Sequence, residues 1–327
     1  MDQTTPIAER SRTIEGGTFE EIAGHEYAKR ALEIAAAGMH HVLIVGPSGT
    51  GKTTLANAME TILPNYWVPE RANGKITGYS PIKHSFRKPY RNIALREMTG
   101  AGRILREGEI EKANGGVLFL DDLAEYRRKV LETLIEPLKI RQVVHTNGSI
   151  HVIGSASFGL LATLKTCVCG CHLDRIRECR CTVGQVKRYQ QRIPREVFDC
   201  FEIVVDVPPV PVAKIAHAQS LEPSEVMRSR VESAYQISKE RLNKYGYTRN
   251  AEMGETAIRE CCRMDEKSTT LLIKGVECKQ LANGAYFQIL RVARTIADLA
   301  GSESIRIADV AEAIQYQRRN PWEYQAG

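Results

Sequence analysis

Length, composition and charge describe an ordinary globular protein and exclude several other classes. The chain has 327 residues, enough for about two domains, of which 43% are hydrophobic and 26% are charged. Glu33, His40 and His41 interrupt the longest apolar stretches, so we expect no membrane-spanning segment and no membrane partner. The polar N-terminus carries no apolar signal core, which favours a cytoplasmic protein, and the net charge of +6 permits a polyanionic partner without requiring one.

The predicted elements, in chain order, describe an α/β core followed by helices. We expect a loose arm at 1–18, a helix within 19–38, a strand at 41–45, a helix from 54, a polar insertion or hairpin at 64–106, a strand at 117–120, a helix at 128–139, one or two strands between 143 and 162 with a turn at 147–148, and a strand at 201–207. From about residue 212 onward the pattern is helical, with the clearest apolar spacing between Ile289 and Leu299. The resulting organisation is a core at 19–210, with a parallel sheet between helices and a cysteine-rich insert at 165–182, followed by an all-helical lid domain at 211–327.

One segment has the spacing G-x-x-x-x-G-K-T of a phosphate-binding loop, namely Gly46-Pro47-Ser48-Gly49-Thr50-Gly51-Lys52-Thr53. An apolar run at 41–45 precedes it as a buried strand, and a helix follows from Thr54, which is the context that separates a site from a fortuitous glycine-rich turn. Backbone amides in such a loop and the start of the helix bind phosphate oxygens. We therefore expect ATP or ADP to bind along 46–54, with Lys52 neutralising the β- and γ-phosphates and the Thr53 hydroxyl reaching Mg²⁺.

A second nucleotide motif follows about 65 residues later, where the apolar strand Val117-Leu118-Phe119-Leu120 ends in Asp121 and Asp122. A strand that ends in acids delivers a carboxylate to the magnesium shell beside the phosphate loop. Asp121 is the natural metal-side acid. Asp122 is the candidate for orienting the attacking water, although it is one methylene shorter than the glutamate that usually stands there. In isolation, the pair could equally be solvated acids at a strand end.

Four segments resemble a known family. They are GHEYAKRALEIAAAG at 24–38, NGGVLFLD at 114–121, RVARTIADLAG at 291–301 and AEAIQY at 311–316. Together they resemble the ComM-like AAA+ ATPases, which are related to the magnesium-chelatase ATPase subunit, and the resemblance covers about residues 18–318. It implies an AAA+ core with a helical lid, and a ring, commonly a hexamer, with ATP at the subunit interfaces. For ComM itself it implies a motor acting on DNA during natural transformation. We expect this chain to lack the N-terminal protease-like domain usual in that family.

The chain departs from the family pattern at its catalytic positions. Lys165 stands at the polar sensor asparagine, Cys200 at the arginine finger and Gly284 at the second sensor arginine. A paired histidine of the family is replaced near Ala94, although the flank at 88–91 is kept. An arginine finger contributes roughly 10³–10⁵ in rate where it has been dissected, whereas binding depends mainly on the phosphate loop. We therefore expect nucleotide binding to survive better than turnover, unless Lys165 or a nearby arginine, Arg192 or Arg195, substitutes.

Five cysteines and a histidine fall within 167–181. Two short pairs, Cys167 with Cys169 and Cys179 with Cys181, could supply the four soft ligands of a tetrahedral structural Zn²⁺. The resemblance supports this hypothesis, because ComM-like sequences carry a similar paired-cysteine insert at this place. Cys171 and His172 are further candidate ligands, and unligated thiols or a redox switch are the alternatives.

The basic stretch at 174–196, with Tyr189 interleaved, is either a DNA-facing patch or a solvated or subunit-contact surface. His145, His151, Cys261, Cys262 and Cys278 are interpreted as structural. Three functional hypotheses remain. The chain is a DNA-linked ring ATPase, or a catalytically weakened nucleotide-binding subunit that acts in a hetero-ring with an active paralogue, or, least favoured because of its cysteine insert, a chelatase subunit acting on porphyrin.

Overall fold

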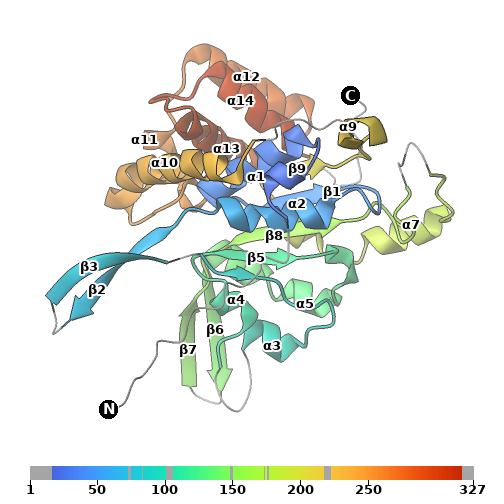
Figure 1. Cartoon of the computed structure of the whole chain (residues 1–327), viewed down its shortest axis with the longest axis horizontal. Coiled ribbons are helices and arrows are strands. Elements are labelled where there is room, and N and C mark those ends of the chain that lie inside the picture. The colour runs from blue at the N-terminus through green and yellow to red at the C-terminus, as the bar shows by residue number, and fades with distance from the viewer. Residues whose placement is uncertain are drawn as a thin grey trace.

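A computed structural model describes residues 17–72, 75–82, 84–100, 106–147, 150–172, 174, 177–216 and 222–318. Its centre is a five-stranded parallel sheet in the order β4-β5-β8-β1-β9 (Figure 1). The strands are β4 (Phe86–Arg87), β5 (Val117–Leu120), β8 (Gly159–Leu164), β1 (Val42–Val45) and β9 (Ile203–Asp206). Val42 pairs with Leu161 of β8 and with Ile203 of β9, which makes β1 a central strand. The predicted α/β class with a parallel sheet is confirmed.

Both faces of this sheet are buried along β5, β8, β1 and β9, because alternate residues of these four strands enter two separate cores. Val42 and Ile44 pack with α1 and with helices of the C-terminal part, whereas Leu43 and Val45 pack with residues between 93 and 204 on the other face. The near-continuous apolar strands are typical of a parallel sheet covered on both sides. The helices of the core, with α1 before the first strand and the others after it, are α1 (Glu26–Gly38), α2 (Lys52–Ala58), α3 (Leu95–Thr99), α4 (Glu109–Lys112), α5 (Arg128–Glu132), α6 (Ile135–Ile140), α7 (Val183–Gln190) and α8 (Arg195–Phe198).

Two antiparallel hairpins project from the core. The first joins β2 (Tyr66–Ala72) to β3 (Lys75–Ile82), and the second joins β6 (Gln142–Asn147) to β7 (Ile150–Ser155) (Figure 1). The segment 143–162, expected to hold one or two strands, therefore contains a hairpin and most of the central strand β8. The prediction was wrong because the break at 156–158 is Ala-Ser-Phe, which carries no glycine or proline turn signal. The predicted turn at 147–148 lies partly outside the described residues, as does most of the arm at 1–18.

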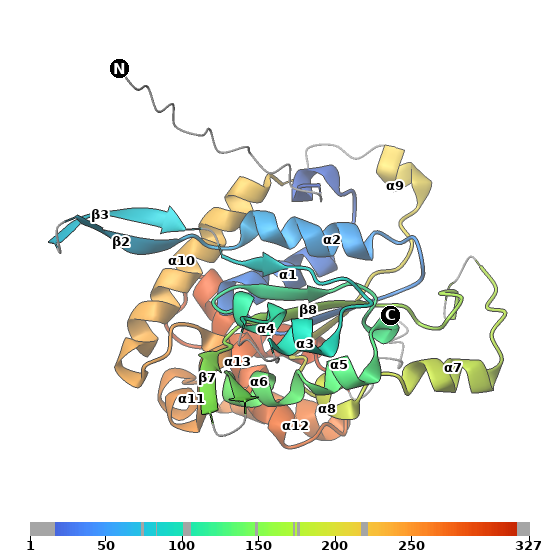
Figure 2. The ribbon, with the colours of Figure 1, turned by 90° about the horizontal axis from the view of Figure 1, so that it is seen from below.

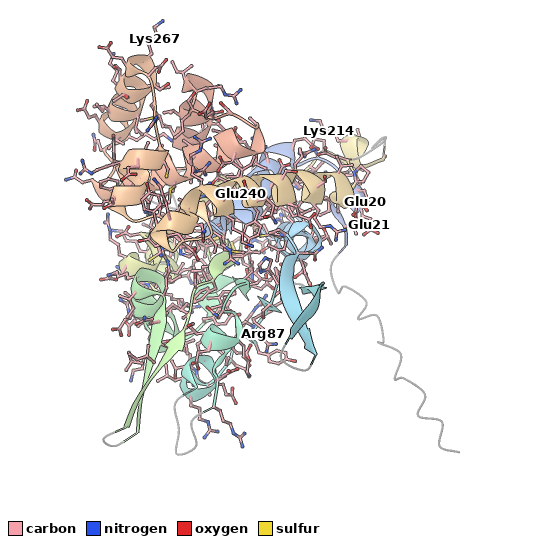
Figure 3. The ribbon with its side chains drawn as sticks, turned by 90° about the vertical axis from the view of Figure 1, so that its left-hand side faces the viewer. Glu20, Glu21, Arg87, Lys214, Glu240 and Lys267 are labelled. Carbon is pink, nitrogen blue, oxygen red and sulfur yellow. The ribbon has the colours of Figure 1, made fainter. Side chains whose placement is uncertain are left out.

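The C-terminal part is helical, as predicted. It consists of α9 (Val212–Ala216), α10 (Ser224–Leu242), α11 (Glu255–Cys261), α12 (Glu266–Cys278), α13 (Gly284–Leu299) and α14 (Ile307–Gln315). These helices lie against one side of the core (Figure 2). Lys267 on α12 marks the end of the helical part farthest from the two hairpins (Figure 3). None of the helices in the described part of the chain is long and apolar enough to cross a membrane.

A buried polar network joins the helical part to the sheet. The Glu202 carboxylate, just before β9, accepts from His40 Nδ1 at 2.6 Å and from Arg291 Nε of α13 at 2.8 Å. His40 Nε2 lies 2.7 Å from the Thr295 hydroxyl, also on α13. Because Glu202 and His40 are almost completely buried, this ion pair depends on close packing between the sheet and α13.

Candidate nucleotide site

The predicted phosphate loop connects β1 to α2 at the carboxyl edge of the central strands, where ligands of open α/β sheets bind. Gly49 and Gly51 have φ of +81° and +86°, a backbone conformation that favours glycine. Gly46 is required for a different reason, since a Cβ there would lie 2.3 Å from the Val207 carbonyl oxygen. The glycines of the motif therefore allow a tight turn directly beside the end of β9.

Lys52 begins α2 and is buried, with its ammonium donating to the Pro47 carbonyl at 2.5 Å. Burial lowers the pKa of Lys52 from 10.5 to about 8, Asp122 opposes this change, and Lys165 and Arg177 add to it. The loop thus encloses a poorly solvated positive charge near further cations. An anion placed there would relieve this unfavourable arrangement.

Asp121 accepts two hydroxyl hydrogen bonds on the same oxygen. Thr53 Oγ1 and Thr163 Oγ1 each donate to Asp121 Oδ1 at 2.8 Å. Burial would raise the pKa of Asp121, but the hydrogen bonds from Thr53, Thr163 and Arg91 outweigh it and keep the pKa below its ordinary value. A hydroxyl and a carboxylate oxygen in contact are a donor set that suits Mg²⁺.

Asp122 is held by two cations. Its Oδ2 lies 2.8 Å from Lys165 Nζ and 3.0 Å from Arg91 Nη2, and its side chain is only 9% exposed. The backbone of Asp122 is left-handed, with φ of 58°, and its amide donates to Thr163 Oγ1 at 2.8 Å. This carboxylate is therefore positioned firmly, and one of its oxygens is already engaged by the two cations.

Sequence reasoning gave no role to three residues of this site. Thr163 is the polar residue of the otherwise apolar strand β8, which was a readable signal. Arg91 donates to Asp121 Oδ2 at 2.9 Å from a segment far away in sequence. His25 lies next to the phosphate loop, because a Cβ built on Gly51 would be 3.9 Å from His25 Nε2. Two successive left-handed residues, Gly24 and His25, shape that approach.

The four cysteines predicted as metal ligands come together. The ligand atoms of Cys167, Cys169, Cys179 and Cys181 all lie within 4.8 Å of one another. The Sγ of Cys167 is 3.3 Å from that of Cys169 and 3.7 Å from that of Cys179. Cys171, although close in sequence, does not belong to this group. Four sulfurs at this separation surround a point where a tetrahedral ion of the Zn²⁺ type fits.

Other predicted positions lie elsewhere. Cys200 precedes β9, at the opposite edge of the sheet from the phosphate loop, and lines a cavity of about 350 Å³ with Arg141 and Arg291. Gly284 is exposed at the start of α13. Tyr189, considered above for contact with DNA, is only 1% exposed and cannot stack on a base, because the apolar side of α7 packs it into the core.

Comparisons with known proteins agree with this architecture. The family model for magnesium chelatase, subunit ChlI, matches residues 18–215, and the model for the C-terminal part of that subunit matches residues 221–317. The competence protein ComM of Haemophilus influenzae is 33% identical over 307 residues, covering 91% of this chain and 59% of that protein. The protein YifB of Escherichia coli is 31% identical over 327 residues, covering 97% of this chain and 63% of that protein.

The chain therefore spans about 60% of the length of these relatives. The family models cover the parallel sheet with its phosphate loop and also the helical part that follows. On the strength of these matches, the chain belongs to the magnesium chelatase subunit ChlI family of AAA+ proteins and is similar to its ComM-like members.

Proposed function

We propose that this chain binds ATP with Mg²⁺ at the loop 46–54. The observation that carries the proposal is the contact between Thr53 and Asp121 beside the buried Lys52 ammonium, which unites the phosphate and metal ligands at one edge of the sheet. When bound, Mg²⁺ would supply positive charge that offsets the charge of the phosphates. Thr53 and Asp121 would hold the ion, and Lys52 would replace its hydrogen bond to Pro47 with bonds to phosphate.

We propose that hydrolysis is slow. Asp122 is the residue available for orienting water, and its pairing with Lys165 and Arg91 weakens it in that role. Cys200 cannot stabilise charge that develops on a transferring phosphoryl group, and Gly284 offers no side chain. The same two cations lie beside Asp121 and Asp122 and are the partial substitutes that this site offers for the missing arginines. Nucleotide binding therefore depends on the intact phosphate loop, whereas turnover depends on positions where this chain departs from the family pattern.

The proposed assembly and partners of this chain are those that membership of the family suggests. A ring, commonly a hexamer, would place the edge that carries Cys200 against a neighbouring subunit, so an active paralogue in a hetero-ring could supply the missing arginine. We place the boundary between the core and the helical lid near residue 211, and the protein in the cytoplasm. Four thiols within 4.8 Å of one another support a structural Zn²⁺ in the insert.

DNA-stimulated hydrolysis is the second candidate function. A relative carries the name competence protein, and a broad groove beside Asp121 is lined by several basic side chains, among them Lys88, Arg91, Arg96 and Arg106. Glu97, Glu107 and Glu109 line the same groove, so its charge alone does not favour DNA strongly.

One experiment separates these functions. ATP binding and phosphate release are measured on the same purified sample, with and without single-stranded DNA, for the parent and for Asp121→Asn. We expect magnesium-dependent binding that Asp121→Asn weakens, with turnover well below about 1 s⁻¹. Turnover that DNA raises into the range of ordinary enzymes would favour the DNA-linked motor. Binding that is unchanged without Mg²⁺ and in Asp121→Asn would contradict the proposed metal site.

A further inference from the structure

The cysteine-rich insert folds back onto the phosphate loop. The Ser48 amide donates to the Gly170 carbonyl at 2.9 Å, and Arg177 Nη2 donates to the Ser48 carbonyl at 2.5 Å. Figure 1 shows the insert, before α7, at the same end of the sheet as the turn between β1 and α2. Ser48 is the third residue of the phosphate-binding motif. Both backbone groups of this one residue are therefore bonded by the insert.

The contact is close enough to require glycine on the insert side. Gly170 has φ of +74°, and a Cβ there would lie 2.0 Å from the Ser48 hydroxyl oxygen. The conformation of Gly170 is set by its neighbours in the cluster, because its amide donates to the Cys167 carbonyl at 3.0 Å and it directly follows Cys169. The arrangement of the four sulfurs and the position of Gly170 are therefore coupled through one turn of the backbone.

Among the described residues of the insert, little buried apolar surface fixes this turn. Of the four clustered cysteines, only Cys167 is buried, and Val168 between the first pair is 56% exposed. Arg177 is oriented by Asp174, whose carboxylate accepts from its Nε at 2.9 Å. A short polar segment with so little buried apolar surface gains most of its order from a cross-link. In small cysteine sites a bound metal supplies that order, and removing the metal unfolds the site.

We propose that the insert is a metal-dependent clamp on the phosphate loop, in which Zn²⁺ held by Cys167, Cys169, Cys179 and Cys181 fixes Gly170 and Arg177 against Ser48. The clamp strengthens nucleotide binding because it holds the loop in its phosphate-binding conformation before the nucleotide arrives. This consequence rests on the proposed function, whereas the clamp itself concerns the conformation of the loop alone. The metal is structural in this arrangement, since four sulfur ligands leave no position for a reacting group.

The test uses the full chain under reducing conditions, and hydrogen exchange of the segment 46–53 is its primary measurement. Bound zinc is quantified in the parent, in Cys169→Ser, and in Cys278→Ser, an exposed cysteine on α12 that serves as the matched control. We expect one zinc ion per chain in the parent and in Cys278→Ser. In Cys169→Ser and in chelator-stripped parent, we expect the ion to be lost and the Ser48 amide to exchange at least about tenfold faster.

Arg177→Ala is a second variant, which tests the clamp even if Cys169→Ser fails to fold. We expect it to keep its zinc and its melting temperature while exchange of 46–53 rises and ATP binds roughly tenfold more weakly, as expected for the loss of a hydrogen bond to a charged group. Absence of zinc from the parent, or identical exchange of 46–53 with and without the metal, would overturn the clamp. A zinc-dependent change in exchange, together with no ATP binding by the parent, would support the clamp and instead refute the proposed function.

Discussion

Replacing Lys52 with methionine separates the stability of the phosphate loop from its function. The pKa of Lys52 falls from 10.5 to about 8 on folding, mainly through burial. Because one pKa unit corresponds to about 1.4 kcal/mol, keeping this ammonium charged at neutral pH costs the folded protein roughly 3 kcal/mol. The hydrogen bond to the Pro47 carbonyl returns about 1 kcal/mol of that. Lys52→Met, which keeps the volume of the side chain, should therefore not destabilise the nucleotide-free protein.

The same substitution should strongly weaken nucleotide binding. A hydrogen bond to a charged group contributes about 1.5–3 kcal/mol, so we expect the Kd for ATP to rise about 10- to 100-fold. Binding is measured by fluorescence titration with a labelled ATP, and stability by thermal unfolding without nucleotide. We expect the melting temperature of Lys52→Met to equal that of the parent or to exceed it by a few degrees.

Lys267→Met is the matched control, since Lys267 is exposed on α12 at the far end of the helical part (Figure 3). It should leave both the Kd and the melting temperature unchanged. Two outcomes would refute the reasoning. One is ATP binding by Lys52→Met that equals that of the parent. The other is a large fall in its melting temperature, which would mean that Lys52 serves the fold and not the ligand.

Two further predictions concern turnover and acid stability. Lys165→Asn restores the family's polar sensor residue and removes one of the two cations that contact Asp122. Phosphate release should therefore become several-fold faster in this variant. Slower release would instead show that Lys165 assists the reaction. Burial would raise the pKa of Glu202, but His40 and Arg291 outweigh burial and keep this pKa below its ordinary value of 4.5. The interaction of Glu202 with these two residues therefore stabilises the fold fully above pH 4.5. The stabilisation is lost as the pH falls through the lower pKa of the folded state. Glu202→Gln should cost roughly 3–5 kcal/mol in unfolding free energy at neutral pH and less near about pH 3, and an equal loss at both pH values would contradict this assignment.

The part of the site that could be predicted from the sequence is the part encoded locally. The loop 46–53 could be predicted because a strand, a glycine-rich turn and a helix follow one another in the chain. Asp121 could be predicted because it directly follows an apolar strand. The short spacing within each cysteine pair likewise predicts a cluster, and the four sulfurs do converge.

The remaining contacts join segments that are distant in sequence. Arg91 reaches Asp121 from the region after β4, and Thr163 reaches it from β8, so neither contact leaves a spacing that a reader could recognise. The contact between Gly170 and Ser48 could not be predicted from the sequence either, because a polar loop has no periodicity that indicates which segment it will contact. The hairpin of β6 and β7 was merged with β8 in the prediction because no breaker residue separates them.

Calorimetric titration of ATP into the zinc-loaded full chain, at millimolar Mg²⁺, tests the central claim most directly. The arrangement of Lys52, Thr53 and Asp121 predicts one ATP per chain, with the heat of binding strongly reduced in Lys52→Met. If neither ATP nor ADP produced any heat, and the variant behaved like the parent, the assignment of this loop as a nucleotide site would be contradicted.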